Sequence, residues 1–157
     1  MTEKQRVLMV CLGNICRSPI ADAVFARTVQ EKGIDDKWDV DSAALIGYHT
    51  GNNPDHRARE TLKNKGIANY SHKARPIKTD DFNKFDWIFG MDESNISELN
   101  KKKPRGSKAK IELLGKYDPQ GETIIVDPYY DCDNDGFYKV YEQCKRSVEA
   151  FLHQQQS

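Results

Sequence analysis

The chemically active side chains of this sequence are densest in one short segment, residues 11–18, which has the sequence C-L-G-N-I-C-R-S. Cys11 offers a thiol nucleophile, and Arg17 offers a planar fork of donors that fits two oxygens of a phosphate group. Gly13 and Asn14 both tolerate the positive φ that a tight anion-binding loop requires. These residue types at this spacing predict a loop that binds a phosphate and presents a thiol to it.

The surroundings of this segment support the same prediction. The apolar run at residues 6–11 predicts a buried strand, and Pro19 is suited to the first turn of a helix that follows. Ligands bind at the carboxyl ends of strands in α/β sheets, and free N–H groups at a helix N-terminus attract anions and favour a thiolate. We expect Cys11 to attack phosphorus in line and form a thiophosphate, assisted by Ser18. The alternative is that Cys11 is an ordinary buried cysteine.

Hydrolysis also needs a proton donor for the departing alkoxide or phenolate, and a carboxylic acid can supply it and then act as base toward water. Two Asp-Pro pairs are candidates, at Asp118 and Asp127. Tyr129 and Tyr130 follow Asp127 and could line the mouth of a pocket, whereas residues 118–121 have the sequence of a plain turn. The pattern favours Asp127 and leaves Asp118 open.

The other cysteines and the histidines give weaker signals. The four cysteines are Cys11, Cys16, Cys132 and Cys144. We expect free thiols and no metal, because a single C-x4-C spacing without clustered histidines is weak support for a zinc site. His72 taken alone is typical of a structural histidine, and His49 and His56 lie in polar segments where we expect them to be solvated.

The pattern along the chain predicts strands that alternate with helices. Strands are expected at residues 6–11, 38–43, 86–91 and 110–114. Helices are expected at residues 18–33, at 55–65, after 79–81, from 92 and at 137–152. This order predicts an α/β fold with a parallel sheet covered on both faces. With 157 residues and no linker, we expect a single domain over residues 1–157.

Composition excludes several classes of protein. The 24 basic residues balance 24 acidic ones, which excludes a strongly basic nucleic-acid binder, and 10% aromatic residues argue against disorder. No signal peptide and no apolar run of about 18 residues are present, so we expect a cytoplasmic protein without a membrane span. The zero net charge hides two adjacent blocks of opposite charge, +6 over residues 101–116 and −6 over residues 117–136. The simple interpretation of these two blocks is that they are solvated loops. The alternative is that the acidic block favours substrates whose flanking residues are basic.

The segment C-L-G-N-I-C-R-S-P, residues 11–19, resembles the active-site loop of the low-molecular-weight protein tyrosine phosphatases. Four later blocks resemble that family in the same order: D-S-A-A at 41–44, S-H-K-A-R at 71–75, M-D-E-S-N at 91–95 and D-P-Y-Y at 127–130. The resemblance extends over essentially the whole chain. It implies a single domain with a four-stranded parallel sheet flanked by helices and a phosphate-binding loop after the first strand.

The resemblance also implies an activity, hydrolysis of phosphotyrosine in proteins and of small aryl phosphates, with inorganic phosphate as product and no cofactor. It implies Cys11 as nucleophile, Arg17 as phosphate ligand and Asp127 as general acid and base. The phosphate-binding residues would be Leu12, Gly13, Asn14, Ile15, Cys16, Arg17 and Ser18. Residues supporting the loop would be Asn14, Ser18, Ser42 and His72. The pocket rim would comprise Tyr48, His49, Tyr129 and Tyr130. Cys16 matches a cysteine that forms a disulfide with the nucleophile on oxidation, and a monomer or weak dimer is expected.

Three alternatives stay open. Arsenate reductases with a similar loop need further cysteines near the pocket, for which Cys132 and Cys144 are the remaining candidates. Protein arginine phosphatases resemble this loop with a threonine where this chain has Ile15, and the bulkier Ile15 favours phosphotyrosine. A non-catalytic phosphate-binding module would need neither Cys11 nor Asp127.

Overall fold

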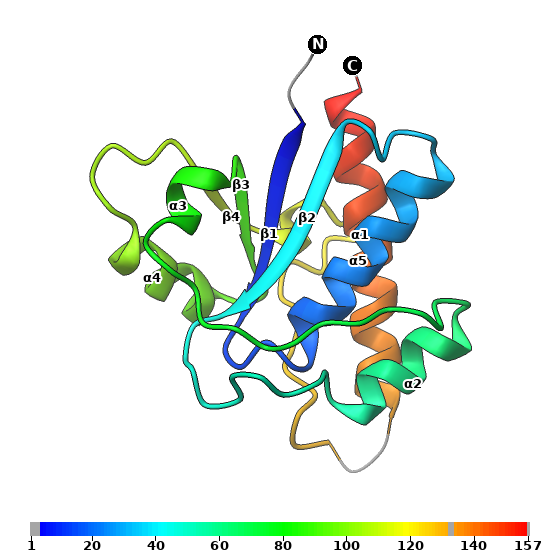
Figure 1. Cartoon of the computed structure of the whole chain (residues 1–157). Coiled ribbons are helices and arrows are strands. Elements are labelled where there is room, and N and C mark those ends of the chain that lie inside the picture. The colour runs from blue at the N-terminus through cyan, green and yellow to red at the C-terminus, as the bar shows by residue number, and fades with distance from the viewer. Residues whose placement is uncertain (1–3, 132–133, 157) are drawn as a thin grey trace.

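The computed structural model describes residues 4–131 and 134–156, whose strands form one parallel sheet (Figure 1). The strands are β1 (Gln5–Cys11), β2 (Trp38–Ala44), β3 (Trp87–Gly90) and β4 (Lys110–Leu113). Their order across the sheet is β2-β1-β3-β4, and every neighbouring pair is parallel. The predicted α/β fold with a four-stranded parallel sheet is confirmed.

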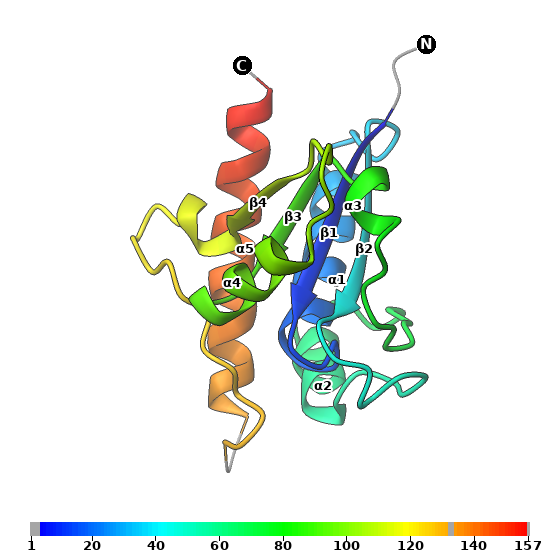
Figure 2. The ribbon, with the colours of Figure 1, turned by 90° about the vertical axis from the view of Figure 1, so that its left-hand side faces the viewer.

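Helices cover both faces of this sheet, as predicted (Figure 2). They are α1 (Arg17–Glu31), α2 (His56–Asn64), α3 (Asp81–Lys84), α4 (Glu93–Lys102) and α5 (Asp135–Gln155), with a 3₁₀ helix, η1 (Leu114–Tyr117), after β4. The helices α1 and α5 pack against one face, whereas α3 and α4 lie on the other. No helix of the described residues is long and apolar enough to cross a membrane.

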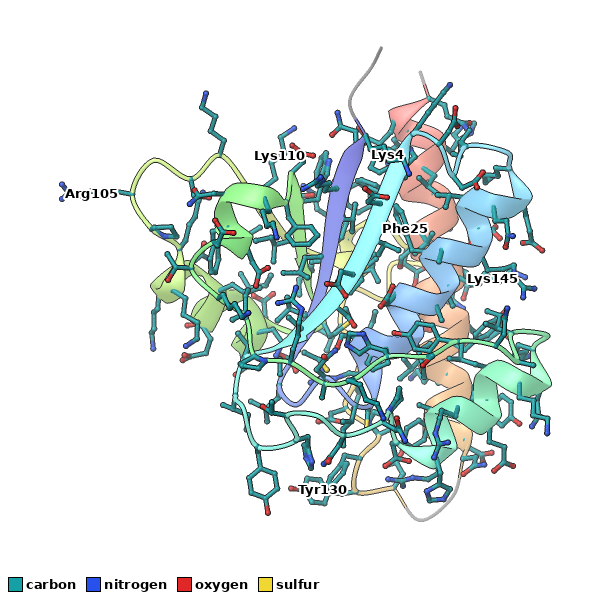
Figure 3. The ribbon with its side chains drawn as sticks, viewed as in Figure 1. Lys4, Phe25, Arg105, Lys110, Tyr130 and Lys145 are labelled. Carbon is teal, nitrogen blue, oxygen red and sulfur yellow. The ribbon has the colours of Figure 1, made fainter. Side chains whose placement is uncertain are left out.

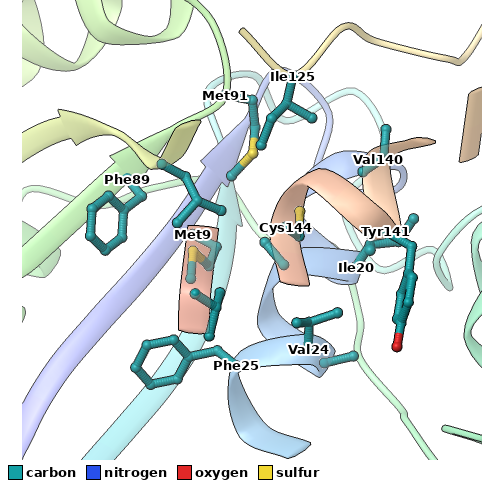
Figure 4. Packing of buried hydrophobic residues seen from close by; sticks show 14 of the residues in the cluster. Met9, Ile20, Val24, Phe25, Phe89, Met91, Ile125, Val140, Tyr141 and Cys144 are labelled. Atoms are coloured by element: carbon teal, nitrogen blue, oxygen red, sulfur yellow. The ribbon is translucent and has the colours of Figure 1, made fainter. Parts of the chain in front are cut away.

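The continuous apolar run of β1 is explained by burial on both sides of the sheet. Val7 and Met9 point into the cluster formed with α1 and α5, and Leu8 and Val10 point into the cluster formed with α3 and α4. Figure 4 shows Met9 facing α1 and α5, with Cys144 of α5 in the same core. Because β1 is buried on both faces, its carboxyl end is fixed rigidly, and Cys11 lies at that end.

Parallel strands bring the loops that follow β1, β2 and β3 to one edge of the sheet. The start of β1 and the end of α5 lie at the opposite edge (Figure 1). The basic loop after α4 is also remote from the site, because Figure 3 places Arg105 and Lys110 far from Tyr130, which lies beside the loop after β1. The fold therefore gathers the predicted site residues at one edge and leaves the basic block away from it.

Candidate active site

The loop between β1 and α1 folds around the sulfur of Cys11. The backbone N–H groups of Asn14 and Ser18 point at this Sγ from 3.3 Å and 3.5 Å. Among the described residues other than glycine, Asn14 alone has a positive φ, of 59°. Gly13 does not have a positive φ, so of the two residues that tolerate this conformation only Asn14 adopts it. The missing side chain of Gly13 serves another purpose, since a Cβ there would lie 3.0 Å from the ring of His49.

The orientation of the Asn14 amide determines which way the hydroxyl of Ser18 points. The backbone N–H of Arg75 donates to Asn14 Oδ1 (3.2 Å), so Nδ2 must lie on the other side, where it donates to Ser18 Oγ (2.8 Å). The ring Nε2 of His72 lies 2.8 Å from the same Oδ1 and therefore carries a proton. Because Ser18 Oγ accepts from Asn14, its own proton is free to point at Cys11 Sγ, 3.1 Å away. The arrangement gives the sulfur a third donor, which stabilises a thiolate.

Ser42 links this amide to a buried carboxyl group on α1. Its Oγ accepts from Asn14 Nδ2 (3.0 Å) and donates to Asp22 Oδ2 (3.2 Å), which also accepts from the hydroxyl of Tyr70 (2.8 Å). Burial lowers the pKa of His72, although the nearby charge of Asp41 opposes this change. The lowered pKa favours the neutral ring. The sequence did not identify Asp22 or Tyr70 as site residues. The only signal for Asp22 is an acidic residue within the apolar stretch of a helix.

Asp22 is expected to make stability depend on pH. Burial raises its pKa from 3.8 to about 7, with the hydrogen bonds from Tyr70 and Ser42 and the charge of Arg75 opposing that rise and the charge of Asp41 adding to it. The folded protein thus keeps a proton that the unfolded chain releases near pH 4, so the free energy of unfolding from this group falls as pH rises from about 4 to about 7. Asp22→Asn cannot ionise and should lack this loss.

Denaturant unfolding of wild type and Asp22→Asn at about pH 5 and about pH 8 measures the effect. The variant should gain more than about 1 kcal/mol relative to wild type between the two pH values, since one pKa unit corresponds to about 1.4 kcal/mol. An equal difference between the two proteins at both pH values would contradict an ionising Asp22.

Arg17 is held behind the loop, with its side chain only 3% exposed. Its Nη1 donates to Asp92 Oδ2 (2.7 Å) and to the carbonyl of Ile125 (2.9 Å), and its Nη2 lies 3.7 Å from Asp127 Oδ2. The buried Nε has no hydrogen-bond partner among the described residues, so it remains available to an oxygen in the site. Although burial opposes its charge, the pKa of Arg17 is raised, because Cys11 and both carboxylates stabilise the cation. Sequence analysis gave no role to Asp92.

A pocket of about 400 Å³ opens above Cys11. Its lining comprises Cys11, Leu12, Gly13, Ile15, Cys16, Ile46, Tyr48, His49, Asp127, Tyr129 and Tyr130. Aromatic rings form a continuous wall, since His49 lies 4.9 Å from the ring of Tyr48 and 6.1 Å from that of Tyr129, which is 4.9 Å from Tyr130. His49 is thus part of the wall, where the resemblance places it, and it is half-exposed rather than fully solvated. His56 is exposed, as expected.

Asp127 and Asp118 have different surroundings. Asp127 lies in the pocket, where Oδ1 accepts from the N–H of Tyr129 (3.1 Å). The Asp118 side chain is fully buried outside this pocket and accepts from Nε and Nη2 of Arg146 at 2.9 Å and 3.0 Å. These hydrogen bonds hold the pKa of Asp118 below its ordinary value despite burial. Glu122 lies 3.9 Å from Arg146 and 3.8 Å from Lys139, so two acids of the −6 block pair with basic residues of α5. A preference for basic flanks stays a prediction.

Three cysteines in the described part of the chain are free thiols, Cys11, Cys16 and Cys144. Burial and the neighbouring Cys11 raise the pKa of Cys16, so its thiol form is favoured. Cys144 is buried in the core beside α1, which is poor placement for a reductase relay, and Cys132 lies outside the described residues. The disulfide between Cys11 and Cys16 stays a prediction.

One pocket is lined by a sulfur surrounded by donors and by the carboxylate of Asp127. A buried guanidinium with an unpartnered N–H, that of Arg17, lies 3.7 Å from this carboxylate. These are the parts required to bind a phosphate monoester, attack it with sulfur and protonate its leaving group.

Known proteins share both this sequence and this fold. The sequence model of the family described as "Low molecular weight phosphotyrosine protein phosphatase" matches residues 6–157. The human protein of that name is 55% identical over 148 residues, covering 93% of this chain and 92% of the human one. The crystal structure of Primo-1 superposes with a TM-score of 0.93 at 45% identity, covering 98% of this chain and 99% of that one. The crystal structure of a Drosophila arginine phosphatase superposes with a TM-score of 0.90 at 39% sequence identity, covering 96% of this chain and 98% of that one. The chain therefore belongs to the low molecular weight phosphotyrosine protein phosphatase family.

Proposed function

We propose that this chain is a protein tyrosine phosphatase that hydrolyses phosphotyrosine and small aryl phosphates through a thiophosphate on Cys11. The observation that carries the proposal is the placement of Cys11 Sγ among three donors at the base of a pocket whose wall holds Asp127. Family membership and the name of the human relative agree with this substrate class.

The first step in this proposal transfers the phosphoryl group to sulfur. The Cys11 thiolate attacks phosphorus, the bond to the phenolic oxygen breaks, and Asp127 gives its proton to that oxygen. Backbone N–H groups of the loop and the guanidinium of Arg17 hold the phosphoryl oxygens, as donors of this kind stabilise developing charge. In the second step, Asp127 takes a proton from water as the water attacks phosphorus, and Cys11 leaves as a thiolate stabilised by the hydroxyl of Ser18.

The shape of the pocket favours an aromatic phosphate ester. The rings of Tyr129 and His49 offer flat surfaces to a phenyl ring, and Ile15 adds an apolar contact at the base. A Drosophila relative is an arginine phosphatase, so phosphoarginine is the second candidate substrate. Ile15 argues against phosphoarginine as the substrate, because the similar loop of the arginine phosphatases has a smaller, polar threonine at that position.

Steady-state hydrolysis by the purified chain, with a chelator present and no added metal, tests the proposal. Phosphotyrosine peptides should be hydrolysed with a kcat/KM at least about 10-fold above that for phosphoarginine peptides, a difference of about 1.4 kcal/mol between transition states. Faster hydrolysis of phosphoarginine, thiol-dependent reduction of arsenate, or binding of phosphate without turnover would each contradict it and identify one of the alternatives.

The partners proposed are proteins that carry phosphotyrosine, and the compartment proposed is the cytoplasm. A nucleophilic Cys11 must stay reduced, and reducing compartments keep thiols in that state. No nucleic acid is proposed as a partner, because the net charge of the sequence is zero.

A further inference from the structure

Asp127 is carried by the segment between the end of η1 at Tyr117 and the start of α5 at Asp135, whose described residues, 118–131 and 134, form no helix or strand. A segment of this length without regular structure keeps one conformation only if side chains elsewhere bind its backbone. The position of the Asp127 carboxylate in the pocket therefore depends on those contacts.

On the N-terminal side of Asp127, the contacts converge on Ile125. Its N–H donates to the carbonyl of Met91 (2.9 Å), and its carbonyl accepts from Nη1 of Arg17 (2.9 Å). This side of the segment is thus fixed to Met91, directly after β3, and to the phosphate-binding arginine itself.

On the C-terminal side of Asp127, the contacts converge on Arg57, at the start of α2. Its Nη2 donates to the carbonyl of Tyr129 (2.8 Å), and its Nη1 donates to the carbonyl of Asp131 (2.9 Å). The N–H of the same Tyr129 donates to Asp127 Oδ1 (3.1 Å). One residue therefore joins the arginine to the carboxylate, with its carbonyl bound by Arg57 and its N–H bound by Asp127.

Arg57 is itself held rigidly. Its Nε and Nη2 donate to the two carboxylate oxygens of Asp55, each at 3.0 Å, and its guanidinium lies 4.6 Å from the ring centre of Phe137. The backbone N–H of Asp55 donates to the carbonyl of Ile15 (2.8 Å), within the phosphate-binding loop. Through Asp55, the guanidinium of Arg57 thus connects the segment that carries Asp127 to the loop that holds Cys11.

We propose that Arg57 is a positioning residue for the general acid, fixing the distance between Asp127 and the loop that holds Cys11. The inference rests on the proposed function, because it acts through Asp127 and involves no contact with the substrate. Four hydrogen bonds from one planar group require a guanidinium, since an ammonium offers no fork in a fixed plane. Displacement of a reacting group by about 1 Å can cost about 100-fold in rate.

The test compares Arg57→Lys and Arg57→Met with wild type on aryl phosphates whose leaving phenols differ in pKa. With phenyl phosphate, which needs the proton, kcat/KM should fall about 10- to 100-fold. With dinitrophenyl phosphate, which leaves without it, the loss should be under about 3-fold. Arg59→Met is the matched control on the same helix, because Arg59 is exposed and its side chain donates, among the described residues, only to the carbonyl of Pro54 (3.2 Å).

A double-mutant cycle separates positioning from general stability. In an Asp127→Ala background, Arg57→Lys should cause no further loss with phenyl phosphate, because the group that it positions is gone. Equal losses on both esters, or an additive loss in the double variant, would overturn the inference. Arg57→Lys keeps a positive charge for the ring of Phe137, so it decides the question if Arg57→Met does not fold. If wild type hydrolyses neither ester, the proposed function fails instead.

Discussion

Substituting serine for Cys11 is expected to lower kcat for phosphotyrosine by about 10⁴-fold or more, the scale found when an enzyme loses its nucleophile. The donors around Sγ stabilise a thiolate, but a serine hydroxyl is far less acidic than a thiol. No histidine is hydrogen-bonded to Cys11 in the described residues to remove a proton from serine, because His72 binds Asn14 and Ser42 instead. Steady-state turnover of a phosphotyrosine peptide measures the loss.

Two measurements show that this loss is chemical. Cys11→Ser should still bind inorganic phosphate, because Arg17 and the backbone of the loop remain, and calorimetric titration measures that binding. Cys144→Ala is the matched control, since Cys144 is fully buried on α5 and does not line the pocket. It should lower the free energy of unfolding by about 1 kcal/mol or more but leave kcat nearly unchanged. If Cys11→Ser keeps a tenth of wild-type turnover, thiolate catalysis is wrong.

Replacing Asp127 by alanine is expected to lower kcat/KM for phenyl phosphate by about 10²- to 10⁴-fold, the range of general acid catalysis. With dinitrophenyl phosphate the loss should be at least about 10-fold smaller, because that phenolate departs without protonation. A plot of log kcat/KM against the pKa of the leaving phenol should therefore be steeper for the variant.

Asp118→Ala is the contrasting variant, because the sequence left Asp118 open as the acid. Its side chain binds Arg146 of α5 and is buried away from the pocket, so its loss should lower the free energy of unfolding by about 1–3 kcal/mol. Activity measured below the unfolding transition should stay near wild type for both esters. A leaving-group dependence in Asp118→Ala, and none in Asp127→Ala, would reverse the assignment of the acid.

Local patterns in the sequence were sufficient for the elements and for the loop after β1. The apolar run before Cys11, the helix start at Pro19 and the Gly after α2 each reflect interactions within a few residues, and the structure has β1, α1 and α2 close to their predicted bounds. Alternation of strands with helices then predicted a parallel sheet, because parallel strands need crossover connections. Cys11, Arg17 and Ser18 could be recognised because all three lie in one segment of eight residues, 11–18.

Contacts between distant segments could not be predicted in this way. Arg57 meets Tyr129 across 72 positions, and Tyr70 meets Asp22 across 48, so no periodicity relates the partners. The same applies to His49, which is polar in a polar loop, yet lies against Gly13 in the pocket wall. Whether an acid lines a pocket or forms half of a buried ion pair depends on such contacts, as Asp127 and Asp118 show.

The sequence by itself therefore determined the fold class and predicted the phosphate-binding loop and its nucleophile, because short-range spacing and burial patterns encode them. The tertiary structure decided the direction of the hydrogen bonds toward Cys11, the environment of Asp22 and the fixing of Asp127 by Arg57. Each of these depends on the separation of side chains in space, which folding sets by packing whole elements against one another.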